Sequence, residues 1–498
     1  MNDSLHKPTI VYDGECSMCV VVMKKIDSSS IGSEFKKINI HQSLPAGVTH
    51  EEVKKEIHFF DRNGKIYKGS EAIIKILDEY SRFKLIAKIG TFPGIKHLLS
   101  IGYKFVAANR HFIFGSSSRI FWLKIVLACG FISGLLLSVK LWLHTRFYPL
   151  TPLIPEFPTI QFPYDYAVFS IILILLVSII FSYRPRKLIF CFLILLLGTI
   201  ILDQSRWQPW VYQYAFMFIA LGLYSWNHKD TEKQNSALTI CRFIIASIYI
   251  WSGLQKINPG FILHVFPWMI EPVIKFFPTF LKPVMYSTAL LVPFIEAGIG
   301  LFLLTKKFRN VGVVLAILMH LNILFLLGPL LHNWNNVVWP WNIAMILIVA
   351  ILFWNSNTSF KEIIFNNKSY FHYIVVVLFG IMPLFSFFGM WDSYLSSTLY
   401  SGNIKEGTIY VSSNVKSKLS PEIQVYAQEI KSNEHKISIY NWSFGELNVP
   451  PYPEERIFKN ITQYVCSYAS EPNDVQLKIE TKNSLLVREQ EGQYFSCE

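Results

Sequence analysis

The chain has 498 residues, of which 52% are hydrophobic and only 16% are charged, and its formal net charge is +12. A water-soluble protein of this length carries more charged residues, so the composition excludes a soluble globular fold for most of the chain and predicts a polytopic membrane protein. A positive net charge is compatible with nucleic-acid binding. However, the basic residues are spread along loops beside apolar segments, and no nucleic-acid-binding motif is present. We therefore expect a lipid membrane, and no nucleic acid, as a partner.

The first element is a short buried strand over residues 8–12, followed by a turn at Asp13-Gly14 and a helix that begins near Cys19. Cys16 and Cys19 stand in C-x-x-C spacing at the start of this helix. Unpaired N–H groups at a helix start stabilise a thiolate, so we expect a lowered pKa for Cys16, which attacks a disulfide, while Cys19 resolves the mixed disulfide. Half a zinc site and two inert structural thiols are the alternatives. No second C-x-x-C pair follows in the first 118 residues, so we expect no metal.

Three motifs occur in order in this segment: Tyr12-Asp13-Gly14-x-Cys16-x-x-Cys19, then Gly69-Ser70-Glu71-Ala72 after a hairpin over residues 57–67, then Ala108-Asn109-Arg110-His111-Phe112-x-Phe114-Gly115. With them the segment resembles the DCC family of thiol-disulfide oxidoreductases, which are thioredoxin-like domains named for an Asp and two cysteines. The resemblance implies an α/β thioredoxin-like domain over residues 1–118, a protein or small-molecule thiol or disulfide partner, and catalytic roles for Asp13, Cys16 and Cys19. Thioredoxins carry a cis-proline beside the cysteines, whereas no proline lies between Pro45 and Pro93 here, so we expect substrate contact to differ.

The middle of the chain, residues 119–391, reads as a polytopic helical membrane domain. Each apolar run is near the length that crosses about 30 Å of hydrocarbon as a helix. The polar start of the chain is not followed by an apolar run, so we expect no cleaved signal peptide. Nine candidate spans lie at about 120–143, 165–183, 187–203, 208–226, 237–255, 284–305, 310–331, 337–354 and 370–391.

Basic loops indicate the orientation. Arg184, Lys229, Lys306 and Lys361 mark four loops that fall on the same side as the N-terminal domain, which the positive-inside rule makes cytoplasmic. An odd number of spans then leaves residues 392–498 outside, so we expect a multi-pass protein of the cell (inner) membrane with a cytoplasmic N-terminus and an extracytoplasmic C-terminus. Between Glu79 and Glu156 there is no acidic residue, and basic residues alternate with apolar ones. Such a connector fits a helix pair on an anionic inner leaflet.

Three ionisable residues stand out in the membrane domain. Lys256 ends the fifth span, where apolar, proline-broken sequence follows, and a lysine in an apolar pocket can serve as a base because burial disfavours its charged form. A lysine that snorkels to the outer interface is the alternative. Glu296 and His320 lie halfway along their spans, where ionisable groups are costly unless paired or functional. We expect them to face each other, either as a hydrogen bond that locks two helices or as a site for proton handling or quinol binding.

The run Tyr249-Ile-Trp-Ser-Gly-Leu-Gln-Lys256-Ile, with a proline-broken stretch and a histidine-containing helix after it, resembles the membrane domain of vitamin K-dependent gamma-carboxylases and their bacterial HTTM relatives. In that family the lysine that matches Lys256 deprotonates a reduced naphthoquinone, and the histidine that matches His320 lies in the same cavity. The resemblance implies catalytic roles for Lys256 and His320, ligand contacts for Tyr249 and Glu296, and a quinone as cofactor. The DoxX and MauE membrane families have similar Gly- and Glu-bearing helices.

The last segment, residues 392–498, has alternating polar and apolar runs with turn residues between them, which predicts a small β-rich domain. Its cysteines, Cys466 and Cys497, are expected to form a structural disulfide worth roughly 3 kcal/mol, with an exported redox relay as the alternative. We therefore expect a membrane-bound thiol-disulfide oxidoreductase that is coupled to a quinone or another apolar ligand. A carboxylase- or epoxidase-like enzyme with Lys256 as base, and a non-enzymatic redox-sensing scaffold, are the alternatives.

Overall fold

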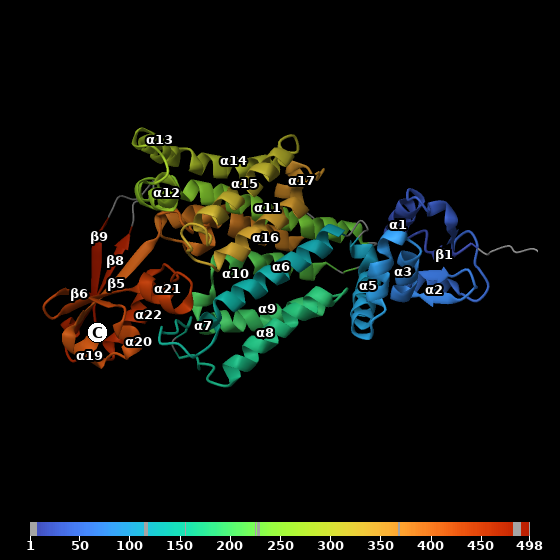
Figure 1. Cartoon of the computed structure of the whole chain (residues 1–498). Helices are drawn as coiled ribbons and strands as arrows, with labels where there is room; N and C mark the ends of the chain where they lie inside the picture. Colours follow the sequence, from blue (N-terminus) through green and yellow to red (C-terminus); the bar gives the residue numbers. More distant parts are fainter. Residues whose placement is uncertain are drawn as a thin grey trace, which may run out of the picture. The chain divides into compact units, whose positions relative to one another are not determined.

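The computed structural model describes residues 7–113, 118–154, 156–224, 226, 230–366, 369–481 and 490–497 (Figure 1). Lys229 and the last two residues of the third N-terminal motif, Phe114 and Gly115, lie outside these residues. The chain divides into two compact units, one of residues 1–122 with 226–231 and the other of residues 123–225 with 232–498. Each unit is described by itself.

The N-terminal unit is a small α/β domain, as predicted. Four strands form a sheet in the order β2-β1-β3-β4, in which β1 and β2 run parallel and the other neighbours antiparallel. Successive side chains of a strand point to opposite faces, so Ile10 and Val11 enter separate apolar clusters on the two sides of β1. The elements are β1 Thr9–Tyr12, α1 Ser17–Asp27, β2 Lys36–Asn39, α2 His50–Lys55, β3 His58–Phe60, β4 Ile66–Lys68, α3 Gly69–Asp78, α4 Lys84–Gly90 and α5 Pro93–Ile113.

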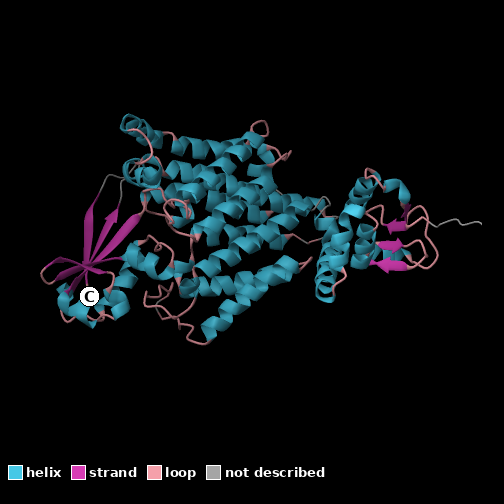
Figure 2. Cartoon of the chain, in the orientation of Figure 1, coloured by secondary structure: helices cyan, strands magenta, loops and turns pink. Residues whose placement is uncertain are grey.

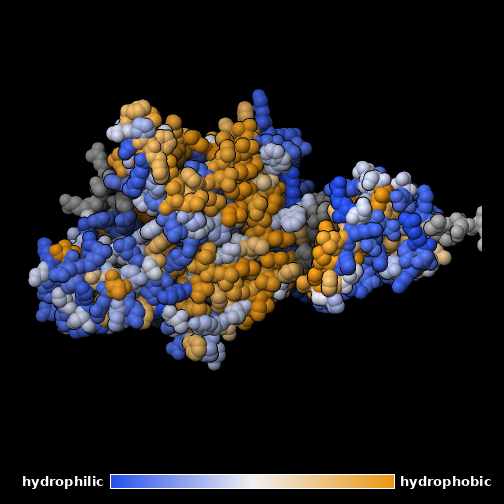
Figure 3. All heavy atoms as spheres, in the orientation of Figure 1, coloured by the Kyte–Doolittle hydropathy of each residue, from blue (hydrophilic) through white to orange (hydrophobic). Residues whose placement is uncertain are grey.

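The second unit begins with a mostly helical body (Figure 2). Hydrophobic residues cover much of its visible surface, which suits a lipid environment (Figure 3). Its helices are α6 Ser118–Leu137, α7 Val139–Trp142, α8 Tyr164–Phe181, α9 Arg186–Leu202, α10 Pro209–Leu223, α11 Thr231–Gln255, the π-helix η4 Phe261–Val265, α12 Phe266–Ile274, α13 Lys282–Ser287, α14 Val292–Leu304, α15 Arg309–Leu327, α16 Val338–Phe353, α17 Phe360–Ile364, α18 Tyr370–Val375, the π-helix η7 Val376–Ile381 and η8 Met382–Phe388.

The expected count of nine spans is not supported. Among the described residues, five helical segments are long and apolar enough to cross a membrane: α6, α8, α11, α15 and Tyr370–Phe388. A sixth is counted if the pair Thr279–Leu290 and Val292–Leu304, bent by 43°, is one broken span. The other three expected spans became α9, α10 and α16, of 17, 15 and 16 residues. Each of these three helices is shorter than the shortest counted span, α8, which has 18 residues.

The C-terminal region of the second unit is a five-stranded antiparallel sheet in the order β6-β7-β5-β8-β9. The sequence predicted a β-rich region here but not the helices that accompany the sheet. These helices pack on the sheet beside β5 through Ile439 and Phe458. A disulfide joins Cys466, the last residue of α22, to Cys497 after β9. The elements are β5 Lys405–Ser412, α19 Ser413–Lys418, α20 Pro421–Gln424, β6 Ala427–Lys431, β7 Glu434–Ser438, α21 Ile439–Leu447, α22 Glu455–Cys466, β8 Val475–Thr481 and β9 Gln490–Ser496.

Hydrogen bonds join this C-terminal region to the helical body. The Glu446 carboxylate of α21 accepts the backbone N–H groups of Phe147 and Tyr148, which follow α7. The Arg456 Nε of α22 donates to Gln204 Oε1 at 2.9 Å. Because these bonds connect side chains and backbone of both parts, the C-terminal sheet is fixed on the helical body.

Candidate functional site

The two N-terminal cysteines lie where β1 turns into α1. Cys16 is the residue that precedes α1, its N–H donates to Asp13 O at 3.2 Å, and its carbonyl accepts the N–H of Val20 at 3.0 Å. Both Cys16 and Cys19 are thiols in this structure. Cys16 is only 1% exposed whereas Cys19 is partly exposed. A partner that reacts with Cys16 therefore has to displace the residues that cover it.

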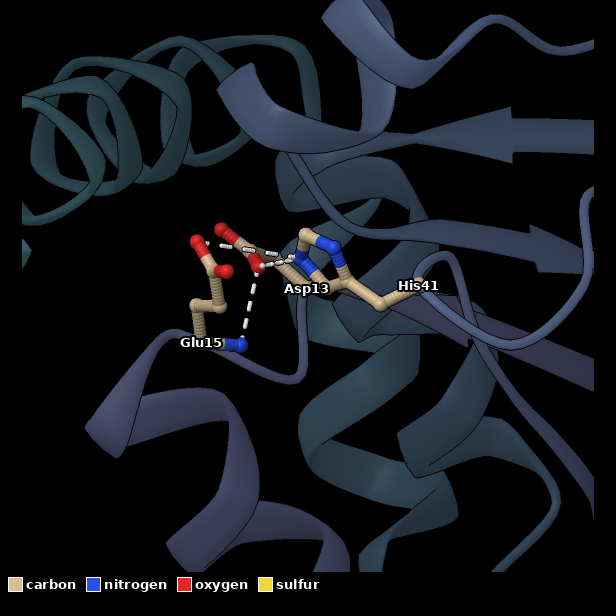
Figure 4. Close-up of side chains that lie close together, drawn as sticks. All are labelled: Asp13, Glu15 and His41. Carbon is tan, nitrogen blue, oxygen red and sulfur yellow. Dashed lines mark hydrogen bonds and ion pairs between the residues drawn. The ribbon is translucent and has the colours of Figure 1, made fainter.

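A cluster of three charged or titratable side chains lies beside this turn (Figure 4). One oxygen of the buried Asp13 carboxylate accepts the N–H of Glu15 at 3.0 Å and is also 3.0 Å from His41 Nε2. His41 Nε2 lies 4.0 Å from the exposed Glu15 carboxylate. These atoms could hold a divalent cation, since they lie within 4.8 Å of one another. Their mutual hydrogen bonds and charges explain the closeness without one.

His41 reaches Asp13 because β1 and β2 are parallel and in register. Tyr12 pairs with Asn39, so the residues that follow the two strands meet at one edge of the sheet. The Asn39 side-chain oxygen accepts the N–H groups of Gly14 and His41, which ties the two loops together. A Cβ at Gly14 would lie 2.1 Å from Asn39 Nδ2, so this close approach requires glycine. The sequence analysis did not predict this contact.

The helical body encloses a cavity of about 180 Å³. Tyr249, Lys256, Glu296 and His320, the four residues singled out in the membrane domain, all line it. Most of the other lining is apolar and comes from α10, α11, α12, α14, α15 and α16 together with Phe379 of η7. Two smaller pockets, one beside Asp165 and Arg206 and one beside Lys405 and Phe458, measure only about 20 and 10 Å³.

One polar group of the cavity is built on Lys256. Its Nζ donates to Glu296 Oε2 and to Ser252 Oγ, each at 2.7 Å. The two side chains meet because α11 and α14 approach closely at glycines. A Cβ at Gly253 would lie 2.5 Å from the Ala297 backbone N, and small residues permit such close helix packing in membranes. Lys256 is 8% exposed and is ion-paired, which contradicts the alternative of a snorkelling lysine.

A second polar group is built on His320. Its Nδ1 lies 2.7 Å from Asn342 Oδ1, and its Nε2 lies 2.6 Å from the Tyr249 hydroxyl. The Asn342 amide donates to Val338 O, so its oxygen faces the imidazole. Nδ1 must therefore carry the proton, and Nε2 accepts the Tyr249 O–H. The expected Glu296–His320 pair does not form, because Glu296 binds Lys256 and His320 binds Tyr249 and Asn342.

The segment between the last apolar helix and the C-terminal sheet closes one wall of the cavity. Tyr394, Ser397 and Tyr400 line it, although all three lie beyond the spans. The Asn335 amide donates to the Tyr400 hydroxyl at 2.7 Å, and the Asn258 amide donates to Ser401 O at 2.8 Å. Sequence reasoning missed this segment because nothing in its local pattern signals that the chain turns back into the helical body.

Comparison with known proteins bears on the N-terminal unit. Residues 10–116 match the model of the family of DCC1-like thiol-disulfide oxidoreductases. The matched residues include all of β1 except Thr9, both cysteines, the Asp13 cluster and α5, but not the helical body or the C-terminal sheet. No curated protein matches the chain, and no solved structure matches it.

Proposed function

We propose that the chain is a membrane-bound thiol-disulfide oxidoreductase whose reactive groups are Cys16 and Cys19. The observation that carries the proposal is a C-x-x-C pair at the start of α1, directly after a buried strand, inside the residues that resemble the DCC1-like family. A dithiol in this position has one thiol beside the unpaired N–H groups of a helix start, which favour a thiolate.

The reaction proceeds in two exchanges. The Cys16 thiolate attacks one sulfur of a partner disulfide, which forms a mixed disulfide and releases the first partner thiolate. The Cys19 thiolate then attacks the Cys16 sulfur, which forms the Cys16–Cys19 disulfide and releases the second partner thiolate. Two electrons pass from the chain to the partner, and the reverse sequence oxidises a partner dithiol. Asp13 accepts or returns a thiol proton, and its contact with the partly exposed His41 links it to solvent.

We place the protein in a membrane with its N-terminal unit in the cytoplasm and its C-terminal sheet outside. Support comes from the apolar helices, from the basic loops at Arg184 and Lys361, which five spans place on the side of the N-terminal unit, and from the Cys466–Cys497 disulfide, since disulfides persist in oxidising compartments. Five complete spans, an odd number, leave the two ends on opposite sides. Alkaline phosphatase fused after Glu498 should be active, and fused after Arg186, which follows the second span, it should be inactive. The reverse pattern would refute this topology.

For the cavity we propose a second role, the binding of a flat apolar ligand of the quinone class. A dry cavity of about 150 Å³ accepts benzene, so a cavity of 180 Å³ has room for a substituted ring. The Lys256–Glu296 pair and the His320–Tyr249 pair offer proton donors and acceptors to the oxygens of such a ring. Two alternative functions are a carboxylase- or epoxidase-like reaction in which Lys256 is the base, and a redox-sensing scaffold without turnover.

Lipid extraction of the purified protein, followed by mass spectrometry, tests this second role. We expect a quinone to copurify with the parent and with Cys16→Ser, and to be lost from Lys256→Met. A full-length Lys256→Met that retains the quinone would refute the cavity assignment. If no quinone copurifies with the parent and thiol exchange persists, the dithiol function stands without this ligand.

A further inference from the structure

The N-terminal unit has an apolar surface that its own fold leaves uncovered. Hydrophobic residues gather over α5 on a unit whose visible surface is otherwise largely hydrophilic (Figure 3). Leu85 of α4 is 71% exposed and Leu98 of α5 is 68% exposed, which is unusual for leucine in a folded domain. We call this surface the α4–α5 face; its exposed apolar residues are Leu85, Ile86, Ile89, Phe92, Ile95, Leu98, Leu99 and Ile101.

The apolar side of α5 points away from the domain. Lys96 Nζ forms an ion pair with Glu71 of α3 at 2.6 Å, and the Ile57 N–H donates to the Tyr103 hydroxyl at 2.9 Å, so these two residues mark the side that contacts the domain. At 100° per residue, Leu98 and Ile101 lie on the opposite side of the helix. The most exposed apolar residues of α5 therefore face outward because of their positions around the helix axis, and not because the end of the helix is unfolded.

The charged side chains of α4 and α5 themselves are all basic. No acidic residue occurs between Glu79 and Glu156, so nothing on α4 or α5 repels an anionic surface. An apolar helix face with exposed lysines beside it has the composition of helices that lie in a bilayer interface. The exposed basic residues of this segment are Arg82, Lys84, Lys88, Lys96 and Lys104.

The chain itself holds α5 near a bilayer. α5 ends at Ile113 and α6, a candidate span, begins at Ser118. Even a fully extended chain covers at most about 3.6 Å per residue, so the end of α5 lies within roughly 20 Å of the start of α6. A surface patch on this helix is thus confined to the neighbourhood of the membrane that α6 enters.

We propose that the α4–α5 face is a binding surface for anionic lipid, with its apolar side chains in the acyl-chain boundary and its lysines on the headgroup phosphates. The proposal relies on the membrane location given above and is independent of the redox chemistry. It holds the dithiol domain flat on the membrane surface instead of leaving it free on a tether, so its thiol partners must be reached at that surface.

Photo-crosslinking of the full chain in lipid nanodiscs tests the proposal. The photoreactive residue p-benzoylphenylalanine replaces Leu98, or Leu85 in a second variant, and a matched control carries it at Asn63 in the polar turn between β3 and β4. After irradiation, mass spectrometry identifies what is attached. We expect phospholipid adducts at positions 98 and 85 but not at 63. The yield should be higher with phosphatidylglycerol than with phosphatidylcholine alone, and this gain should be lost in Lys84→Gln/Lys88→Gln/Lys104→Gln.

Several results would overturn the proposal. Crosslinks from position 98 to peptides of residues 123–498 would show that the helical body covers the face. Crosslinks to an isotopically labelled second copy would make it a dimer contact, and the absence of any adduct would leave it in water. Equal lipid adducts with and without phosphatidylglycerol, unchanged in the lysine variant, would refute the recognition of anionic headgroups. If the full chain fails to enter nanodiscs at all, the membrane location itself is wrong.

Discussion

Removal of one partner of the Lys256–Glu296 pair should destabilise the helical body strongly, and removal of both should not. The side chains are 10% and 11% exposed and their charged atoms are 2.7 Å apart, so each charge depends on the other for compensation. Breaking a buried ion pair by loss of one partner costs about 3–5 kcal/mol, because an uncompensated charge remains in an apolar environment. We therefore expect a loss of this size in Lys256→Met and in Glu296→Gln.

In the double variant Lys256→Met/Glu296→Gln neither charge remains, and the new amide can bond to Ser252 Oγ. We expect most of the loss to be recovered, so the two single effects are far from additive. The assay is thermal unfolding of the protein in detergent, with Ser287→Ala on the exposed end of α13 as a control variant that should keep the parent Tm. Additive losses in the double variant, or unchanged stability in both single variants, would refute the ion pair as the basis of the site.

Three further predictions concern other parts of the chain. Cys497→Ser opens a loop with a sequence separation of 31 residues, so we expect a loss of about 3–4 kcal/mol in the stability of the C-terminal sheet, measured by urea unfolding with and without reductant. Burial lowers the pKa of the His58 imidazole, so the folded domain resists protonation of His58. The stability that His58 contributes is present above about pH 6.5 and is lost as the pH falls below that value. Hydrogen exchange of β1 and β3 should report this loss, and an exchange stability that does not change with pH would contradict it. Gly14→Ala should separate the loops that Asn39 ties together and slow dithiol exchange, whereas Gly102→Ala, in α5 with free space around the position, should leave exchange unchanged.

Sequence reasoning succeeded where the signal is local. The strand, the turn and the C-x-x-C pair are consecutive, so β1 and the start of α1 could be predicted, as could the α/β class of the N-terminal unit. It failed for His41, because that contact depends on the parallel pairing of β1 and β2 across more than twenty residues of chain. The count of nine spans is not supported, because hydropathy measures apolar runs and does not show where a helix is interrupted. The helix α9 ends before Asp203, and α10 begins only at Pro209.

In the membrane cavity, too, local signals could be predicted from the sequence, whereas tertiary contacts could not. Mid-span ionisable residues could be recognised as costly from sequence, and the structure lines one cavity with Lys256, Glu296 and His320. Their pairing could not be predicted, because helix rotation decides that Glu296 meets Lys256 and that His320 meets Asn342. Asn342 itself gave no pattern beyond a single polar residue in an apolar helix.

The central claim is that Cys16 and Cys19 form a redox-active dithiol, and a redox titration of the full chain in nanodiscs tests it most directly. The protein is equilibrated with glutathione buffers of stepped potential, quenched in acid, alkylated, and analysed by mass spectrometry of the peptide that holds both cysteines. We predict a single two-electron transition to a Cys16–Cys19 disulfide, with a tenfold change in the ratio per ~30 mV, and a trapped glutathione adduct on Cys16 in Cys19→Ser. Two thiols that stay reduced across the whole range, or stoichiometric zinc bound to the reduced pair, would contradict the claim.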